Sequence, residues 1–340
     1  MLALRPVALS DLPQLRRLAR ERLLGVTSLV DDETCLREKI LDSLASFAKA
    51  EAEAGQGPEN YFFVLEDPAT GRLHGCSDIL ATAGFSEPFY SLRNRPFISS
   101  SRELDIQHGV PTLSLCHDLS EQTLLRSFHM DVELAGSPLA QLTSRARLLF
   151  IAAHPQRFAD SCISEIVGYS DTDGQSPFWE AVGQHFFDLP YVEAERLCAL
   201  QGRGFLVELM PQYPIYIPML AQAAQDCIGR IHPDAREACD ILVDEGFAPT
   251  QYVDLFDAGP TLQARTNELR SIIQSRIATS YFAAQSGRGR PWLLSNDRLQ
   301  GFRAIVALLD EAPEERIGLG QEMFQALQLE PGAAVRSIAL

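Results

Sequence analysis

The sequence predicts an α/β (α+β) protein with a mixed β-sheet and flanking helices. Up to about residue 190 it indicates elements in the order β-α-α-β-β-β-β-α-β-α-β, a run of neighbouring strands followed by a β-α-β unit. Beyond residue 270 the runs become short and are separated by turns, which is typical of a small, mostly β unit. We therefore expect a main sheet domain over 1–190, a second α/β part over 191–270 and a β-rich C-terminal unit over 271–340.

The first elements are a strand, two helices and a hairpin. "ALRPV" (3–7) indicates a short strand, and a helix follows in which Ser10 is a candidate N-cap and Pro13 lies in the first turn. A second helix is expected over 32–54. Two β-rich runs then flank Asp67-Pro68-Ala69-Thr70-Gly71, where Pro and Gly supply the backbone angles of a hairpin turn.

The remaining elements follow from periodicity and turn residues. Residues 85–110 are rich in turn formers and are expected to be irregular. The other expected elements are strands at 111–119 and 123–132, an amphipathic helix over 140–159, a strand at 161–171, a short helix over 176–187 that runs into a strand, a strand and a loop over 204–220, a helix at 219–228, and a helix after His232.

Composition and charge exclude several classes of function. The chain has 340 residues and a net charge of −16, which argues against nucleic-acid or anionic-membrane binding. It has no run of about 18 apolar residues and no leader-like N-terminus, so we expect a cytoplasmic protein. The seven cysteines and seven histidines lack the spacings of disulfide frameworks or metal sites. We predict no metal.

Seven longer strings carry a resemblance to a known family. They are "GVTSL" (25–29), "GFSEPFYSLRN" (84–94), "SLCHDLS" (114–120), "EIVGYSDTDGQSPFWEAVGQHFFDL" (165–189), "ELMPQYPIY" (208–216), "HPDAREACDILVDEGF" (232–247) and "DLFDAGPTLQART" (254–266). Together they resemble the arginine N-succinyltransferase family, most closely its alpha-subunit branch. The opening strand and helix and the hairpin are similar to the start of a GNAT-type N-acyltransferase.

The resemblance implies a GNAT-like fold and transfer of a succinyl group from succinyl-CoA to the α-amino group of L-arginine. In this family that reaction opens a route of arginine catabolism, and some members are implied to use ornithine. The resemblance also implies pairing with a related beta subunit or a homo-oligomer. Succinyl-CoA would be a co-substrate, and no permanently bound cofactor is expected.

His232 is the candidate catalytic residue. Its unperturbed pKa of about 6.5 allows proton transfer near neutral pH, and acyl transfer to an amine benefits from an acid at the leaving thiolate. The family resemblance assigns the matching histidine a proton-donor role. The alternative is a residue that only starts the helix ahead of Pro233.

Ser127, Gly136 and Arg145 are the candidate CoA-binding residues. GNAT folds bind the CoA pyrophosphate with backbone N–H groups at a Gly-rich turn before a helix. Here that turn keeps only Gly136, while Pro138 removes an N–H group and Glu133 would repel a phosphate. The family pattern marks the strand around Ser127 as a succinyl-CoA contact. Arg145 and Arg147 on the following helix either meet phosphates or are solvated.

Four carboxylates are candidates for binding the guanidinium of arginine: Glu165, Glu208, Asp254 and Asp257. A planar guanidinium favours a bidentate carboxylate partner. Each of the four lies at a strand end or in an apolar run, where a structural partner is equally expected because an unpaired charge is costly there.

Two other functions remain open at this point. The departures at 133–138 favour a non-catalytic or supporting alpha subunit whose beta chain binds CoA. A GNAT enzyme with another acyl donor or amine is the third possibility, and the family strings argue against it.

Overall fold

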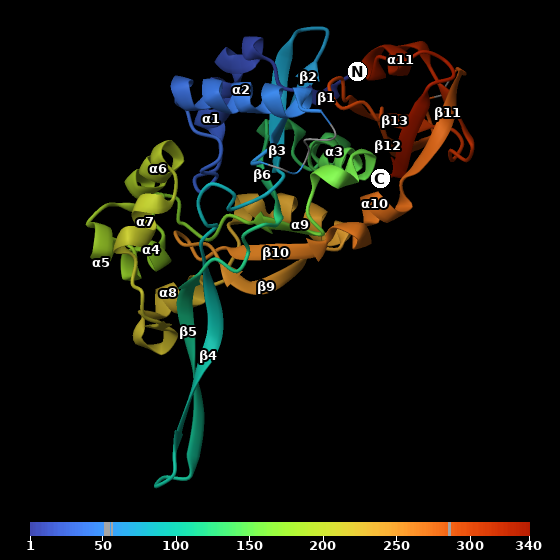
Figure 1. Ribbon diagram of the computed structural model, residues 1–340. Coiled ribbons are helices and arrows are strands. Elements are labelled where there is room, and N and C mark those ends of the chain that lie inside the picture. The colour runs from blue at the N-terminus through green and yellow to red at the C-terminus, as the bar shows by residue number, and fades with distance from the viewer. Residues whose placement is uncertain (51–54, 56, 285–286) are drawn as a thin grey trace.

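The computed structural model describes the chain except residues 51–54, 56 and 285–286 (Figure 1). Its described strands form one continuous mixed sheet in the order β14-β11-β15-β12-β13-β1-β2-β3-β6-β7-β10-β9-β4-β5-β8. The strands are β1 (Ala3–Pro6), β2 (Asn60–Asp67), β3 (Arg72–Leu80), β4 (Ser91–Ser101), β5 (Ile106–Cys116), β6 (Thr123–Met130), β7 (Ser161–Glu165), β8 (Ile215–Tyr216), β9 (Ala248–Val253), β10 (Pro260–Arg265), β11 (Arg276–Phe282), β12 (Arg290–Ser295), β13 (Ala304–Leu309), β14 (Arg316–Leu319) and β15 (Ala334–Ala339). This arrangement confirms the predicted mixed α/β fold.

The helices lie on both faces of the sheet. They are α1 (Leu12–Glu21), α2 (Glu33–Ala48), α3 (Pro138–Ala153), α4 (Pro177–Ala181), α5 (Gln184–Phe187), α6 (Tyr191–Gln201), α7 (Gly204–Leu209), α8 (Gln222–Cys227), α9 (Arg236–Glu245), α10 (Arg270–Gln274) and α11 (Gln321–Leu327). With the β4–β5 hairpin set aside, the elements follow one another as β1-α1-α2-β2-β3-β6-α3-β7, which agrees with the GNAT-like fold that the resemblance implied. None of the helices in the described ranges is long and apolar enough to span a membrane.

Alternating side chains of β2 show which helices cover each face of the sheet. Phe62 and Val64 pack in one core with residues of α1 and α2, whereas Tyr61, Phe63 and Leu65 pack in another with α3. This is the period of two that a strand covered on both faces requires.

Strands β6 and β7 separate soon after they meet, and this separation positions the site. They pair in parallel only at Thr123–Cys162 and Leu124–Ile163. Beyond that point, side chains bond to the carbonyl groups of β6: Ser164 Oγ donates to Leu125 O (2.9 Å). The two strands therefore leave a gap between them.

Strand β6 also carries a bulge at the gap. Its register against β3 shifts, with Asp78 opposite Arg126 but Cys76 opposite His129, so β6 has one extra residue in between. Within this stretch Ser127 has φ = 54°, a left-handed conformation that is uncommon for a residue with a side chain. The bulge interrupts the regular ladder of β6 at the place where β6 and β7 separate.

Residues 85–110, expected to be irregular, instead contribute most of a long hairpin. β4 and β5 pair continuously from Ser91–Cys116 to Ser101–Ile106, and Figure 1 shows the ribbon projecting from the body. The sequence expectation was wrong because most of the ribbon is exposed, so its strands lack the apolar alternation of a half-buried sheet.

Four further expectations were wrong. The segment 176–187 forms α4 and α5 without entering a strand, and 204–209 forms α7 where a strand was expected. Helix α3 is buried along almost its whole length, because it packs against the sheet and against α9 and α10. The helix expected over 32–54 ends at Ala48, and the predicted stretch 51–54 lies outside the described residues.

The sheet crosses both predicted part boundaries. β7 pairs with β10 over Ser161–Arg265 to Glu165–Thr261, and β1 pairs with β13 at Leu4–Ala304. The β-rich unit beyond residue 270 has its own core, which includes Leu294, Leu319 and Phe324. The three-part division itself stays a prediction.

Candidate active site

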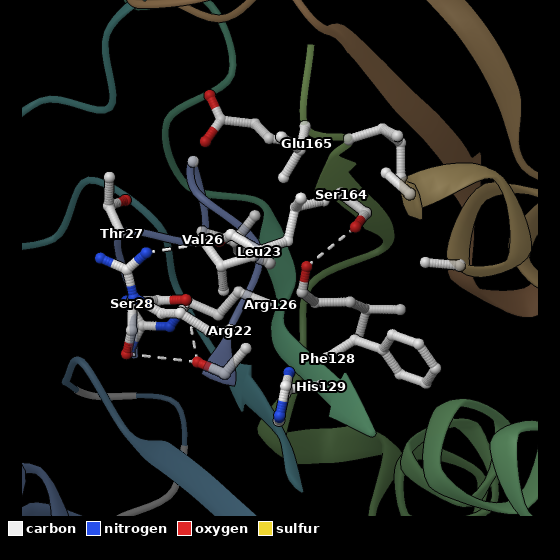
Figure 2. A pocket seen from close by; sticks show the side chains of 18 of the residues that line it. Arg22, Leu23, Val26, Thr27, Ser28, Arg126, Phe128, His129, Ser164 and Glu165 are labelled. Carbon is white, nitrogen blue, oxygen red and sulfur yellow. Dashed lines mark hydrogen bonds between the residues drawn. The ribbon is translucent and has the colours of Figure 1, made fainter. Parts of the chain in front are cut away.

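A cavity of about 1390 Å³ opens where β6 and β7 separate. Its walls come from the loop after α1, from α2, from β6 and β7, and from the start of α9. Figure 2 shows Arg126, Phe128 and His129 along β6, Ser164 and Glu165 along β7, and loop residues such as Thr27 and Ser28 facing them. Ser127, Gly136, Glu165, Asp254 and Asp257 of the sequence-predicted set line this cavity.

A buried ion pair holds the bulge of β6. Lys39 Nζ, from α2, lies 2.6 Å from Asp78 Oδ2 on β3 and donates to Ser127 Oγ (2.7 Å) and Ser28 O (2.6 Å). Arg126 Nε donates to Asp78 Oδ1 (3.0 Å). Lys39 thus ties the bulge both to β3 and to the loop after α1.

The charges of this group stabilise one another. Burial alone would raise the pKa of the Asp78 carboxyl, but Arg126 and Lys39 hold that pKa below its usual range. Burial lowers the pKa of Lys39, and Asp78 opposes this change. Removing either partner would leave an uncompensated buried charge.

On the other side of the gap, a second buried group joins three charged side chains. Arg203, at the start of α7, donates from Nη1 and Nη2 to both oxygens of Glu165 (3.0 and 2.7 Å) and from Nη2 to Asp254 Oδ2 (3.1 Å). Although burial lowers the pKa of Arg203, the two carboxylates hold it above its usual range. Burial raises the pKa of Glu165 to about 7, with Arg203 opposing and Asp254 adding to the effect.

Asp257 lies deeper and binds backbone groups. Its carboxyl accepts hydrogen bonds from the N–H groups of Gly168 and Gly259 (2.8 Å each) and lies 3.4 Å from the Tyr191 hydroxyl. Burial and the nearby Asp254 raise its pKa to about 7. These two bonds join the loop after β7, which contains Gly168, to the loop between β9 and β10, which contains Asp257 and Gly259. The carboxyl of Asp257 therefore has a structural role.

His232 lies beside the wall of the cavity rather than in its lining. Its backbone N–H donates to Val167 O (2.9 Å), just beyond β7, and Pro233 and Asp234 line the cavity. The Asp234 N–H donates to His232 Nδ1 (3.1 Å). Because Nδ1 accepts this bond, the proton of the neutral imidazole is on Nε2. His232 is thus both a helix N-cap and a potential donor at Nε2.

The turn before α3 binds a carboxylate of the protein itself. The Gly136 N–H donates to Glu237 Oε1 on α9 (2.7 Å), at the position where the GNAT-type turn would offer N–H groups to a phosphate. Arg145 lies apart from the cavity lining, because its guanidinium is buried against Glu245 (3.1 Å).

Glu208 is also separate from the cavity. It is an exposed residue of α7, not part of an apolar strand as expected. Sequence reasoning missed Lys39, Arg126, Arg203 and Glu237, which all line the cavity. Lys39 and Glu237 occur in helices with ordinary charged patterns, and their partners are distant in the chain, so no local pattern reveals them.

Comparison with known proteins gives the family. A family profile described as "Arginine N-succinyltransferase beta subunit" matches residues 2–271, and one for its C-terminal domain matches residues 283–339. The chain belongs to the arginine N-succinyltransferase family. It is 54% identical to the protein named arginine N-succinyltransferase subunit alpha of Pseudomonas aeruginosa, with all of both chains covered.

Other members of the arginine N-succinyltransferase family match over nearly the full length. The subunit beta of Pseudomonas aeruginosa is 36% identical, covering 99% of this chain and 97% of that one. A solved structure described as arginine/ornithine succinyltransferase subunit AI from Pseudomonas aeruginosa superposes with a TM-score of 0.93 at 52% identity, covering 100% of this chain and 98% of that one. The fold and the family that the sequence predicted are confirmed.

The raised pKa of Glu165 predicts a specific dependence of stability on pH. A carboxyl whose folded-state pKa exceeds its ordinary 4.5 stabilises the fold fully below that pH, and the contribution is lost as the pH rises through about 7. Relative to Glu165→Gln, the wild-type free energy of unfolding should fall by about 3 kcal/mol at most between pH 5 and pH 8. Urea unfolding of both proteins across this range measures the difference, and parallel curves would contradict the prediction.

Proposed function

We propose that this chain transfers the succinyl group of succinyl-CoA to the α-amino group of L-arginine, with ornithine as a second acceptor to be tested. Its full-length similarity to proteins named arginine N-succinyltransferase carries the proposal. In the reaction a C–N bond forms, the C–S bond of the thioester breaks, the amine loses a proton and the thiolate of CoA gains one. These steps need no covalent enzyme intermediate.

The gap between β6 and β7 is the proposed path of the donor. The bulge at Ser127 lies beside the gap, and the ladder between β6 and β7 has ended there. Backbone donors in such a position stabilise a developing oxyanion when water is excluded. Succinyl-CoA acts as a co-substrate in this proposal, and the chain needs no permanently bound cofactor.

The charge of the cavity supports a cationic acceptor. Among its lining residues, eleven carry carboxyl groups and six are Lys or Arg. L-Arginine brings a guanidinium and an α-ammonium group, both attracted by such a cavity. We place its guanidinium on the side of Glu165 and Asp254, which already bind the guanidinium of Arg203 with the required geometry. Asp257 adds negative charge behind them.

His232 is proposed to serve the leaving thiolate. With Nδ1 accepting from the Asp234 N–H, the neutral ring offers Nε2–H as a donor. A donor at this position stabilises the thiolate as the C–S bond breaks, whereas the same tautomer has no free acceptor for the ammonium proton. The hydrogen bond to Nδ1 therefore supports a role for His232 as a hydrogen-bond donor to the thiolate over a role as a base.

A supporting alpha subunit is the second candidate function. The specific observation in its favour is that the carboxylate of Glu237 accepts the hydrogen bond of the Gly136 N–H at the turn before α3. A donor phosphate would have to displace this carboxylate. In this alternative a related beta subunit binds CoA and the chain completes or stabilises the complex in the cytoplasm. An assembly with a beta subunit or with further copies of this chain accompanies either function.

Turnover by the purified chain alone tests the proposed function. We expect it to release CoA from succinyl-CoA only when L-arginine is present, measured by HPLC because the seven cysteines would react with a thiol dye. Acetyl-CoA should be a poor donor. Turnover that appears only after a beta subunit is added would contradict self-sufficient catalysis and support the second candidate.

Substitution of His232 tests its role in the reaction. His232→Ala should lower kcat by about 10²–10⁴ if the imidazole stabilises the thiolate in the transition state. His185→Ala is the matched control, because His185 is exposed on α5 and outside the cavity lining. A kcat within about twofold of wild type would return His232 to a structural role as a helix N-cap.

Removal of the charge of Glu237 tests the phosphate turn. Glu237→Gln should tighten succinyl-CoA binding about five- to tenfold, because a neutral amide oxygen is a weaker acceptor for the Gly136 N–H and no longer repels a phosphate. Glu133→Gln removes the same charge from the neighbouring turn and should have the smaller effect. Isothermal titration calorimetry gives both values of Kd. Equal effects of the two substitutions on Kd would contradict the proposed competition between Glu237 and a phosphate for the Gly136 N–H.

A further inference from the structure

Two cations pair with one carboxylate at the closed end of the gap between β6 and β7, and a third cation lies near them. Lys39 and Arg126 both pair with Asp78, at 2.6 and 3.0 Å. Arg147, on α3, is close enough for the same carboxylate to affect its pKa. Within the described chain, this group therefore has two more positive than negative charges, although the protein carries a net charge of −16. Such an excess is expected where an anionic group binds.

Arg126 offers unused hydrogen-bond donors to the cavity. Its Nε binds the Asp78 carboxylate, at 3.0 Å from Oδ1 and 3.3 Å from Oδ2. Nη1 and Nη2 have no hydrogen-bond partner among the described residues, and the side chain is 30% exposed at the cavity wall. Its free nitrogens can bind a carboxylate in the bidentate geometry that a lysine cannot provide.

Arg147 is a buried cation that forms no ion pair with the described residues. It is 2% exposed, and its guanidinium donates to Ser144 O, Ser144 Oγ and Arg126 O (3.0, 3.0 and 3.3 Å). None of these partners in the described part of the chain is a carboxylate. Burial lowers its pKa to about 10, so it remains charged at neutral pH. A buried, unpaired charge costs free energy, which an anion bound in the adjoining cavity would offset.

We propose that Arg126, supported by the buried Arg147, binds the free carboxylate of a substrate at the closed end of the gap. This inference rests on the proposed succinyl transfer, in which that carboxylate belongs either to the succinyl group or to the α-carbon of L-arginine. The hydrogen bond from Arg147 to Arg126 O joins the two residues across β6. Arg126 is then a specificity-determining residue, which favours substrates with a carboxylate over uncharged analogues of the same size.

Four substrate pairs identify the carboxylate. We would measure kcat/KM for wild type and Arg126→Gln with succinyl-CoA or butyryl-CoA as donor and L-arginine or L-argininamide as acceptor. Butyryl-CoA has a methyl group where the succinyl group has its carboxylate, and argininamide lacks the α-carboxylate. We expect Arg126→Gln to lose about ten- to a hundredfold with every pair that retains the bound carboxylate, and to match wild type with pairs that lack it.

The pattern of losses decides the outcome. A loss that depends on the donor assigns Arg126 to the succinyl carboxylate, and a loss that depends on the acceptor assigns it to the α-carboxylate. An equal loss with all four pairs, or no loss, overturns the inference. Arg126→Lys preserves a positive charge beside Asp78, so it keeps the test valid if Arg126→Gln does not fold. It should show a smaller loss of kcat/KM with the same substrate pairs.

Wild-type turnover separates this inference from the proposed function. If wild type transfers neither acyl group to either acceptor, the proposed function fails. In that case the Kd of succinyl-CoA and of arginine for both proteins still tests Arg126. A Kd that Arg126→Gln weakens about tenfold or more for either ligand supports carboxylate binding, and unchanged values overturn it.

Discussion

The site depends on the buried ion pair between Lys39 and Asp78. This pair joins α2 to β3 and, through Ser127, fixes the bulge at which β6 leaves its neighbour. Ser127 adopts a left-handed backbone conformation there, which surrounding contacts must hold in place. The gap and the cavity both follow from this local departure from a regular sheet. An apolar pair would fill the same space, but would leave the bulge without its hydrogen bonds.

The two sides of the gap carry different charges, and this difference organises the proposed chemistry. On the β6 side, cations exceed carboxylates around Asp78. On the β7 side, the guanidinium of Arg203 is shared between Glu165 and Asp254, with Asp257 close by. An amino acid acceptor and an acyl donor with a free carboxylate both require such separate regions of opposite charge. The cavity is acidic as a whole, which suits the cationic acceptor more than the polyanionic CoA.

The sequence predicted the parts of the fold whose residues show local periodicity or turn chemistry. The turn at 67–71 lies between β2 and β3, and the strand–helix opening corresponds to β1 and α1. The β4–β5 arm escaped prediction because exposed strands lack alternation, and α7 because its apolar run suits a strand or a helix equally. Family strings brought Glu165, Asp254 and Asp257 into the candidate site. Partners such as Lys39 and Arg203 could not be found, because buried ion pairs join residues far apart in the chain.

The most direct measurement is a crystal structure of the chain with L-arginine and a non-reactive succinyl-CoA analogue, in which a methylene group replaces the thioester sulfur. Our account predicts that the pantetheine arm passes between β6 and β7 along the bulge at Ser127, with the acyl carbonyl at the closed end of the gap and the His232 ring facing the replaced sulfur. An analogue bound elsewhere, with the gap between the two strands left empty, would contradict the account.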